Sequence, residues 1–377
     1  MEMTITAKIQ IYPTNEQSEH LNRTLSQIIE TLNYISNFVY TNNCYKQKEL
    51  NDKTYYYLRE NFGLKSQMAQ SCMKTVLAKY KSAKSNGHKL SLVEFNNPEY
   101  DLVWNRDYSI NKGVFSINSL NGRLKIPYEI KGMEKYFDGS YSFGTAKLVK
   151  NKSKYYLHIP VTKDYPNCEI PNINNIVGID LGLNFIATTY DSKGNTKFFN
   201  GKPIKHLRGK YKELRKQLQE KQTPSSRKRL KNIGERENRY ITDVNHQITK
   251  ALIDLYGSNT LFVLEDLSGI RNATEKVRIK DRYVSVSWAY YQFQQMLEYK
   301  ASLIGSKVIY VNPRYTSQMC PKCGHIEKTN RDKKNHIFCC KNCNYKSNDD
   351  RIGAMNLWRK GIEYIEQSQL QSETTES

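Results

Sequence analysis

The feature that most constrains the fold of this chain is a dense group of cysteines. Five of its eight cysteines lie within 24 residues, and four of them form two C-x-x-C pairs separated by 16 residues: Cys320 with Cys323, and Cys340 with Cys343. Two residues between ligands let one tight turn direct both thiolates at one ion, and this spacing is typical of a two-hairpin zinc ribbon. Four thiolates fill a tetrahedron, so the sequence predicts a structural Zn²⁺.

The surrounding residues fit this interpretation. Gly324 stands where such a turn needs positive φ, and Asn344 can serve the same purpose in the second pair. Cys339 precedes Cys340, but only Cys340 forms a C-x-x-C pair with Cys343. The other cysteines are expected to be ordinary small apolar side chains; they are Cys44, Cys72 and Cys168.

The chain is expected to stay in the interior of a cell, in the cytoplasm. The sequence lacks a run of roughly 18 apolar residues that could cross a membrane. Its first residues, 1–8, lack the apolar core of a secretory signal. Thiols stay reduced in a cell interior, which suits metal-binding cysteines better than disulfides.

Two apolar segments each end in a carboxylate. Residues 175–180 end at Asp180, and residues 260–265 end at Glu265, 85 residues later. Asp350 is a third candidate, at the start of the last predicted helix. A single strand-end acid is often a cap or a surface group, and an acid in a first helical turn also complements the helix dipole. Taken together, the three predict a site for two Mg²⁺ ions, which need shared oxygen ligands and can drive phosphodiester hydrolysis.

The charge balance predicts a polyanionic partner. Lys and Arg total 58 against 37 Asp and Glu, a formal net charge of +21, and such an excess attracts nucleic acid. Fourteen of the basic residues, with only four acids, lie between Lys202 and Arg239. A solvated helix laced with i,i+4 ion pairs is the alternative, but four acids cannot neutralise fourteen bases. The predicted phosphate contacts are Lys205, Arg208, Lys210, Lys212, Arg215, Lys216, Arg227, Lys228, Arg229, Lys231, Arg236 and Arg239.

The first half of the chain mixes strands and helices. Alternation over residues 4–12 predicts a strand, and a helical pattern follows from Thr14. A second helix is expected to begin near Ser66 as N-cap, followed by a basic loop over 81–89. Residues 90–165 predict short antiparallel strands of a sheet or small barrel. If the first strand joins that sheet, the helical part is an insertion into a β domain.

The second half predicts an α/β layer whose opening strands form a meander. It follows a linker over residues 166–175 and ends in a polar tail, 366–377, that is expected to be disordered. The elements expected between them are strands 176–180, 184–190 and 195–199, a helical stretch 204–256 broken near Thr223 and Pro224, strand 260–265, a helix near 287–304 and strand 306–311.

The second predicted helix carries polar residues on one side. Gln67, Gln70 and Lys74 share that side and could reach base edges in a major groove, although glutamines on a polar face are usually only solvated. The run Tyr55 to Tyr57 is compatible with stacking on bases and with packing inside the protein.

The sequence resembles the TnpB proteins of insertion sequences, which are relatives of small type V CRISPR effectors. Residues 312–324 look like the stretch entering that family's zinc module. Residues 338–343, followed by Asp350-x-x-x-Ala354-x-Asn356, look like its continuation into the last RuvC motif. Residues 179–183 and 264–267 resemble the first two RuvC motifs. The resemblance covers roughly residues 4–362. Ile352 and Asn344 depart from residues common in the family, Asn and Gly, and neither position is a metal ligand.

The resemblance implies an α+β multidomain fold: an RNase H-like RuvC α/β domain with an inserted zinc ribbon, and an N-terminal β-barrel (wedge) domain with a helical insertion. The implied domains are a wedge at 1–13 and 89–166, a recognition insertion at 14–88, a RuvC nuclease domain at 176–314 and 346–365, and a zinc ribbon at 315–345 that binds target nucleic acid.

The resemblance also implies an RNA-guided DNA endonuclease, a monomer that binds guide RNA and target double-stranded DNA and cuts next to a short adjacent motif. Asp180, Glu265 and Asp350 would bind two Mg²⁺ ions for catalysis. Three alternatives stay open: a guided repressor that does not cut, a DNA transposase or transposase accessory protein, and an RNA-free nuclease selective for branched DNA. Family relatives that act as repressors have lost the three acids, so their presence favours cleavage.

Overall fold

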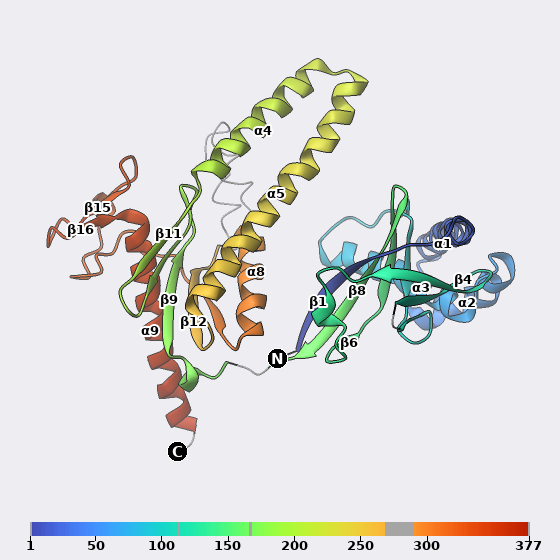
Figure 1. Ribbon diagram of the computed structural model, residues 1–377, viewed down its shortest axis with the longest axis horizontal. Coiled ribbons are helices and arrows are strands. Elements are labelled where there is room, and N and C mark those ends of the chain that lie inside the picture. Colours follow the sequence, from blue (N-terminus) through green and yellow to red (C-terminus); the bar gives the residue numbers. More distant parts are fainter. Residues whose placement is uncertain (1, 112, 166–167, 268–289, 376–377) are drawn as a thin grey trace. The chain divides into compact units, whose positions relative to one another are not determined.

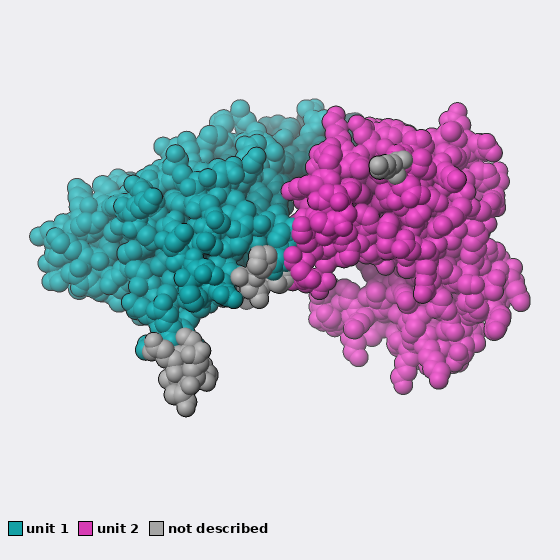
Figure 2. Space-filling model, turned by 60° about the horizontal axis from the view of Figure 1, so that its bottom comes forward, with its two compact units in different colours: residues 1, 165–377 teal, residues 2–164 magenta. Residues whose placement is uncertain are grey.

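The computed structural model describes residues 2–111, 113–165, 168–267 and 290–375. The chain divides into two compact units, residues 2–164 and residues 165–377 with Met1, which Figure 2 colours separately. Three predicted segments lie partly outside the described residues. They are the linker 166–175 (at 166–167), the helix near 287–304 (at 287–289) and the tail 366–377 (at 376–377). None of the helices in the described part of the chain has the length and apolar character that a membrane crossing requires.

An eight-stranded antiparallel sheet organises the first unit. Strand β1 (Glu2–Ile11) pairs along its whole length with β8 (Lys154–Asp164), and its end pairs with β5 (Gly122–Glu129). This confirms that the first strand joins the later sheet. The edge strands β2 and β3 are joined by only five residues, so the sheet is nearly closed. The remaining strands are β2 (Glu99–Leu102), β3 (Tyr108–Asn111), β4 (Val114–Ser119), β6 (Ser142–Phe143) and β7 (Ala146–Asn151).

Three helices, inserted after β1, pack on this sheet (Figure 1). Helix α1 (Asn15–Thr41) begins with a capping box in which Thr14 and Gln17 satisfy each other's backbone N–H groups. Its apolar face is buried, as the periodicity predicts. Helix α2 (Gln47–Asn61) was not predicted, because it buries only Leu50, Thr54 and Leu58, and the surrounding polar residues obscure that stripe.

Two expectations about α3 (Ser66–Ser85) are wrong. Its N-cap is Lys65, with no side-chain capping bond, and Ser66 is already helical. The basic loop expected over 81–89 begins only at Asn86, because the helix continues through Ser85. Lysine and alanine are good helix formers, so a basic run without an apolar period can still extend a helix.

The second unit is built on a five-stranded sheet in the order β11-β10-β9-β12-β13. The first three strands form the predicted antiparallel meander, while β12 and β13 lie parallel to β9. The bounds are β9 (Asn175–Asp180), β10 (Phe185–Asp191), β11 (Thr196–Asn200), β12 (Thr260–Glu265) and β13 (Lys307–Val311).

The long helical stretch is a hairpin of α4 (Lys202–Lys221) and α5 (Pro224–Tyr256) that projects away from this sheet (Figure 1). The break lies where the sequence predicts it. Gln222 adopts a left-handed conformation, and Thr223 caps α5 by accepting from the Ser226 N–H at 3.2 Å. Helix α8 (Tyr290–Leu303) packs beside α5 on the sheet.

Helix α9 (Asp349–Thr375) covers the other face of the sheet. The disordered tail predicted from residue 366 is wrong up to Thr375, because the helix continues. The residues there, Glu366-Gln-Ser-Gln-Leu370, mostly favour a helix already nucleated and packed upstream.

Glycines allow α9 to approach the sheet closely. A Cβ added at Gly178 of β9 would lie 2.1 Å from the Ala354 carbonyl oxygen and 2.5 Å from the Trp358 nitrogen. A Cβ at Gly361 would lie 2.6 Å from Ile176. The backbone of α9 therefore rests directly on β9.

The substitution Gly178→Ala is expected to lower the free energy of unfolding by about 3 kcal/mol, because backbone atoms must move to admit one methyl group. Gly209→Ala is the matched control. Gly209 lies in α4 with nothing within 4 Å of an added Cβ, so this change should stabilise the protein slightly. Thermal denaturation of both variants measures the contrast, and equal melting temperatures would contradict this packing.

Candidate metal centres

Asp180 and Glu265 lie at the same edge of the sheet. Strands β9 and β12 are parallel, and their register pairs Ile179 with Leu264, so the two carboxylates occupy the next, equivalent position of each strand. Side chains alternate between the faces of a sheet. Val177, Ile179, Phe262 and Leu264 pack towards α5 and α8, while Ile176, Leu261 and Val263 pack towards α9. Both carboxylates therefore lie on the face that α9 covers.

The first turn of α9 brings Asp350 to this edge. Gly353 lies directly against Asp180, since an added Cβ would be 2.8 Å from both Cγ and Oδ2 of that carboxylate. Asp350 is 8% exposed, and its backbone N–H donates to the Asn348 side chain at 3.0 Å. The start of α9 therefore lies beside the strand end that carries Asp180.

The electrostatics of this corner favour a cation. Burial, followed by the neighbouring charges of Glu265 and Asp350, raises the pKa of Asp180 well above its ordinary value. Burial also raises the pKa of Glu265, against the hydrogen bond from Thr316 that lowers it. The pKa of Asp350 is raised by burial and by Asp349. Carboxylates that disfavour one another's ionisation are a donor set that a divalent ion would stabilise.

The three acids do not converge as tightly as a ligand cluster. Among the described residues, metal-ligand groups with all donor atoms within 4.8 Å are the four paired cysteines and the set His336, Asp349 and Asp350. Asp349 is fully buried and accepts from Arg331 Nε at 2.8 Å, so it anchors the start of α9. Arg331 Nη2 also lies 3.7 Å from Asp350 Oδ1.

Sequence reasoning missed the residues that hold Glu265. The Thr316 hydroxyl donates to Glu265 Oε1 at 2.5 Å, and Gln294 Nε2 donates to the Glu265 carbonyl at 3.0 Å. Asn356 Nδ2 in turn donates to the Thr316 carbonyl at 2.7 Å. Thr316 and Asn356 both stand inside the motifs that carry the resemblance, so those motifs offered a signal for them. Gln294 offered none.

The four predicted cysteines converge. Cys320 Sγ lies 3.6 Å from Cys343 Sγ, and Cys323 Sγ lies 3.6 Å from Cys340 Sγ. They lie in a module with three short strands, β14 (Arg331–Asp332), β15 (Ile337–Cys339) and β16 (Lys346–Asn348). Cys339 does not join the cluster, which settles the register in favour of Cys340.

The two cysteine turns have the same backbone geometry. Gly324 N–H donates to the Cys320 carbonyl at 2.9 Å, and Asn344 N–H donates to the Cys340 carbonyl at 3.0 Å. Both residues have positive φ, 74° and 57°, as predicted. A hydrogen bond from the His325 backbone lowers the pKa of Cys323 to about 6. A preformed tetrathiol cluster with an acidic member fits a tightly held metal such as zinc.

Most of the predicted phosphate contacts are available on the surface of the α4–α5 hairpin. Arg208 is the exception: it is 4% exposed, and its Nε lies 3.6 Å from Glu237 Oε1, so its predicted phosphate contact does not fit the structure. Arg215, half-buried, bonds the same glutamate, and Lys212 is also half-buried. The exposed residues are Lys205, Lys210, Lys216, Arg227, Lys228, Arg229, Lys231, Arg236 and Arg239.

The polar side of α3 is partly engaged within the protein. Gln70 Nε2 donates to Asn51 of α2, and Gln67 Oε1 accepts from Arg106 at 3.2 Å, whereas Lys74 is exposed. Of the tyrosine run, Tyr57 stacks on Tyr34 with ring centroids 5.0 Å apart, and Tyr56 is 71% exposed.

Two family models match parts of the chain between residues 158 and 357. A family model described as "Probable transposase" matches residues 158–272, and one described as "Cas12f1-like, TNB domain" matches residues 290–357. The chain is 29% identical over 250 residues to a CRISPR-associated endodeoxyribonuclease Cas12f1 of Sulfoacidibacillus thermotolerans, covering 62% of this chain and 57% of that relative.

A second relative is the TnpB-like protein MJ0751 of Methanocaldococcus jannaschii, 29% identical over 242 residues, covering 62% of this chain and 83% of the relative. Among solved structures, the chain resembles a Cas12f1 protein determined as a Cas12f1-sgRNA-target DNA complex, with a TM-score of 0.65 and 14% identity over 95% of this chain and 98% of that one. The resemblance to TnpB proteins is thereby confirmed, and so is a multidomain α+β fold shared with Cas12f1.

Proposed function

We propose that this chain is an RNA-guided, Mg²⁺-dependent DNA endonuclease. The observation that carries the proposal is that Asp180 and Glu265 end adjacent parallel strands, and that the charges of Glu265 and Asp350 raise the pKa of Asp180. A divalent cation would stabilise such neighbouring carboxylates. The TnpB-like and Cas12f1 relatives, one of them named an endodeoxyribonuclease, support the same assignment. The net charge of +21 supports a nucleic-acid partner.

In the proposed mechanism, two Mg²⁺ ions would supply an activated water and stabilise the leaving oxygen of a phosphodiester. Asp180 and Glu265 would hold them from adjacent strand ends, and Asp350 from the first turn of α9. The Thr316 hydroxyl keeps Glu265 oriented and, by lowering its pKa, favours the ionised form that binds cations. Arg331 fixes the start of α9 through Asp349.

On this proposal the second unit is an RNase H-like RuvC domain with a zinc ribbon inserted at 315–345, and the first unit is a wedge domain with a recognition insertion at 14–88. The Zn²⁺ would be structural, because four thiolates leave no open coordination position. The α4–α5 hairpin would hold the guide–target heteroduplex by its phosphates, while base pairing reads the sequence. The active form would be a cytoplasmic monomer with its guide RNA.

Neutralising the tip of the hairpin should weaken guide RNA binding. The triple change of Arg227, Lys228 and Arg229 to Gln removes three exposed charges, so we expect about 10- to 100-fold weaker binding and a salt-dependence slope reduced by about 2. Filter binding at several salt concentrations measures both quantities. The matched control changes three exposed lysines of the first unit to Gln (Lys131, Lys152 and Lys154); equal losses in both variants would contradict a specific role for the hairpin.

The proposed function is tested by purifying the chain with its bound RNA, sequencing that RNA, and supplying matched DNA with Mg²⁺. Cleavage that requires both the RNA and the match supports the proposal. Binding of matched DNA without any cleavage favours a guided repressor. Strand-transfer products without RNA favour a transposase, and cleavage of branched DNA after RNase treatment favours an RNA-free nuclease.

A further inference from the structure

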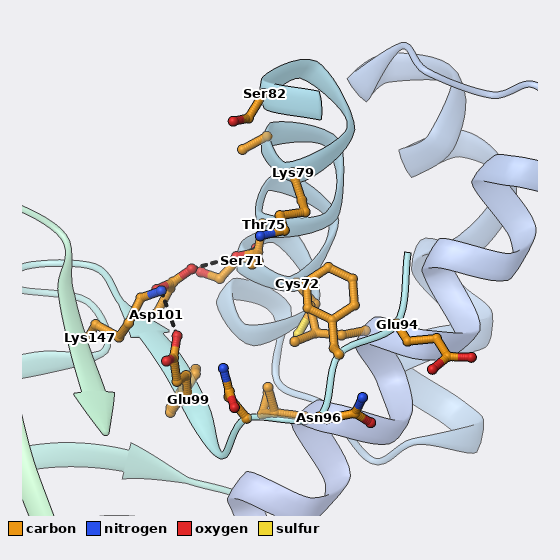
Figure 3. A pocket seen from close by; sticks show the side chains of 16 residues that line it. Ser71, Cys72, Thr75, Lys79, Ser82, Glu94, Asn96, Glu99, Asp101 and Lys147 are labelled. Atoms are coloured by element: carbon orange, nitrogen blue, oxygen red, sulfur yellow. Dashed lines mark hydrogen bonds and ion pairs between the residues drawn. The ribbon is translucent and has the colours of Figure 1, made fainter. Parts of the chain in front are cut away.

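In the first unit, the carboxylates that line a hollow of about 390 Å³ are engaged within the protein. Residues of α1, α3 and β2 line this hollow (Figure 3). Asp101 Oδ2 accepts from the Thr75 hydroxyl at 2.6 Å, and Glu99 Oε2 accepts from Lys147 Nζ at 2.9 Å (Figure 3). These four side chains therefore have a structural role. The second unit, by contrast, exposes an aromatic side chain that has no such role.

This side chain is Tyr315, in the turn that leads from β13 to the first cysteine pair. Tyr315 is 45% exposed and does not belong to the buried clusters of this unit. Among the described residues, its hydroxyl makes no hydrogen bond, and the group beside its ring is the guanidinium of Arg314, 5.6 Å from the ring centroid. The ring therefore contributes little to the stability of the fold.

The backbone of Tyr315 is strained. Its φ is 65°, in the left-handed region, where a bulky side chain is a clear outlier. Glycine or asparagine would adopt this conformation at a lower cost. Strained backbone persists where the surrounding structure enforces it, and it is concentrated at functional sites. An exposed ring on a strained backbone, without a task in the fold, indicates a task in binding.

Hydrogen bonds on both sides of the turn enforce this conformation. The Tyr315 carbonyl accepts from the backbone N–H groups of Gln318 and Met319, both at 3.0 Å. The fully buried Asn356 of α9 donates through Nδ2 to the carbonyls of Thr316 at 2.7 Å and Met319 at 2.9 Å. The ring is therefore carried by a rigid support, which lowers the cost of ordering it on binding.

The turn places Tyr315 close to one of the three acids. The hydroxyl of the next residue, Thr316, donates to Glu265 Oε1 at 2.5 Å. Because neighbouring Cα atoms are about 3.8 Å apart, the Cα of Tyr315 lies within about 9 Å of that carboxylate oxygen. A strand whose phosphodiester lies at the acids therefore has nucleotides within reach of the tyrosine ring. Arg314, which is exposed, adds a cation beside the ring.

We propose that Tyr315 is a substrate-binding residue: its ring stacks on an unpaired base of a single strand at the acids, and Arg314 contacts an adjoining phosphate. Every base has a face that can stack on an aromatic ring, so this contact does not read sequence. In a duplex the faces of each base are already stacked, so the contact favours single strands. The proposal rests on the proposed function, because it needs a nucleic-acid strand at the three acids.

The first test is photochemical cross-linking of the full chain, without divalent metal, to a single strand of 5-iodouracil deoxynucleotides. Ultraviolet irradiation and mass spectrometry should place an adduct on Tyr315. The same strand annealed to oligo(dA) should give about fivefold less of this adduct. Adducts only at other residues, or equal yields from the single strand and the duplex, overturn the proposal.

The second test removes the ring without disturbing the turn. Asn tolerates positive φ, so Tyr315→Asn should keep the melting temperature while the affinity for the same single strand falls about fivefold. Fluorescence anisotropy measures this affinity in about 0.5 M salt, which weakens phosphate contacts made elsewhere. Tyr315→Phe should restore most of the affinity. Unchanged affinity in Tyr315→Asn overturns the proposal, and so does a lower melting temperature, because the ring would then serve the fold.

Leu255→Asn is the matched control. Leu255 is 51% exposed and lies near the end of α5, before β12 begins, whereas Glu265 is at the other end of that strand. Its replacement should leave the affinity unchanged, and an equal loss in both variants would contradict a specific contact at Tyr315. Neither test measures cleavage, so a protein that stacks a base on Tyr315 but cuts no DNA would contradict the proposed nuclease and leave this inference standing.

Discussion

Replacing Asp180 with Asn is expected to reduce DNA cleavage by about 10³-fold or more, because a lost metal ligand removes several kcal/mol of transition-state stabilisation. Asn has the same size as Asp, so guide RNA binding and the fold should persist. Cleavage assays under single-turnover conditions, with the RNA-bound protein, measure the effect. Asp254→Asn is the matched control, since Asp254 is an exposed acid of α5 in the same unit.

The same substitution should stabilise the metal-free protein. The pKa of Asp180 in the folded state is raised by burial and by its acidic neighbours, so its ionisation opposes folding. Below the unfolded pKa of about 4, both states are protonated and no penalty exists. The penalty grows as pH rises towards the folded pKa, so the gain in melting temperature from Asp180→Asn should be larger at pH 8 than at pH 4. A variant that loses stability at pH 8 would contradict the like-charge cluster.

Replacing Cys340 with Ser is expected to remove the bound metal and unfold the module at 315–345. Metal binding supplies roughly 10–16 kcal/mol to small zinc modules. This module has a small core, in which Phe338 belongs to the same buried cluster as Ile352 of α9. Its Arg331 also anchors Asp349 at the start of α9, so cleavage should fall with the metal. Metal content by mass spectrometry and limited proteolysis of the module measure the loss.

Cys339→Ser is the matched control, one residue away and outside the sulfur cluster. It should keep one Zn²⁺ per chain, resist proteolysis and cut normally. Equal behaviour of the two variants would contradict the prediction that these four cysteines hold a structural metal. So would an unmodified protein that holds no metal after purification without chelators.

Much of this architecture was predictable because the local sequence patterns favour the same helices, strands and turns that the whole fold requires. Short sequence patterns predicted several features correctly. Apolar runs that end in an acid predicted the strand ends at Asp180 and Glu265, Thr223 and Pro224 predicted the helix break, and the C-x-x-C pairs predicted the cysteine turns. Helix α2 escaped prediction because three buried residues in a polar sequence give little periodic signal. The extension of α9 past residue 365 was not predicted. A helix that is already packed against the sheet can continue through polar residues, and such residues show no apolar stripe.

The details of the candidate site were less accessible. Gly178 and Gly353 look ordinary in sequence, and only the packing of α9 on β9 explains why an added Cβ would lie within 3 Å of a neighbouring atom at either position. Arg208 resembles its basic neighbours, yet the turn of the helix points it at Glu237 and away from solvent. Such distinctions depend on which face of an element is covered, and composition does not carry that information.

The most direct test of this account is to locate divalent cations in crystals of the full chain soaked with Mn²⁺, using anomalous scattering at the manganese edge. The account predicts manganese ligated by the carboxylates of Asp180, Glu265 and Asp350 together, which would draw the three closer than they stand in the metal-free chain. Manganese bound only elsewhere, for example at His336 and Asp349, or a corner that stays empty at millimolar Mn²⁺, would contradict it.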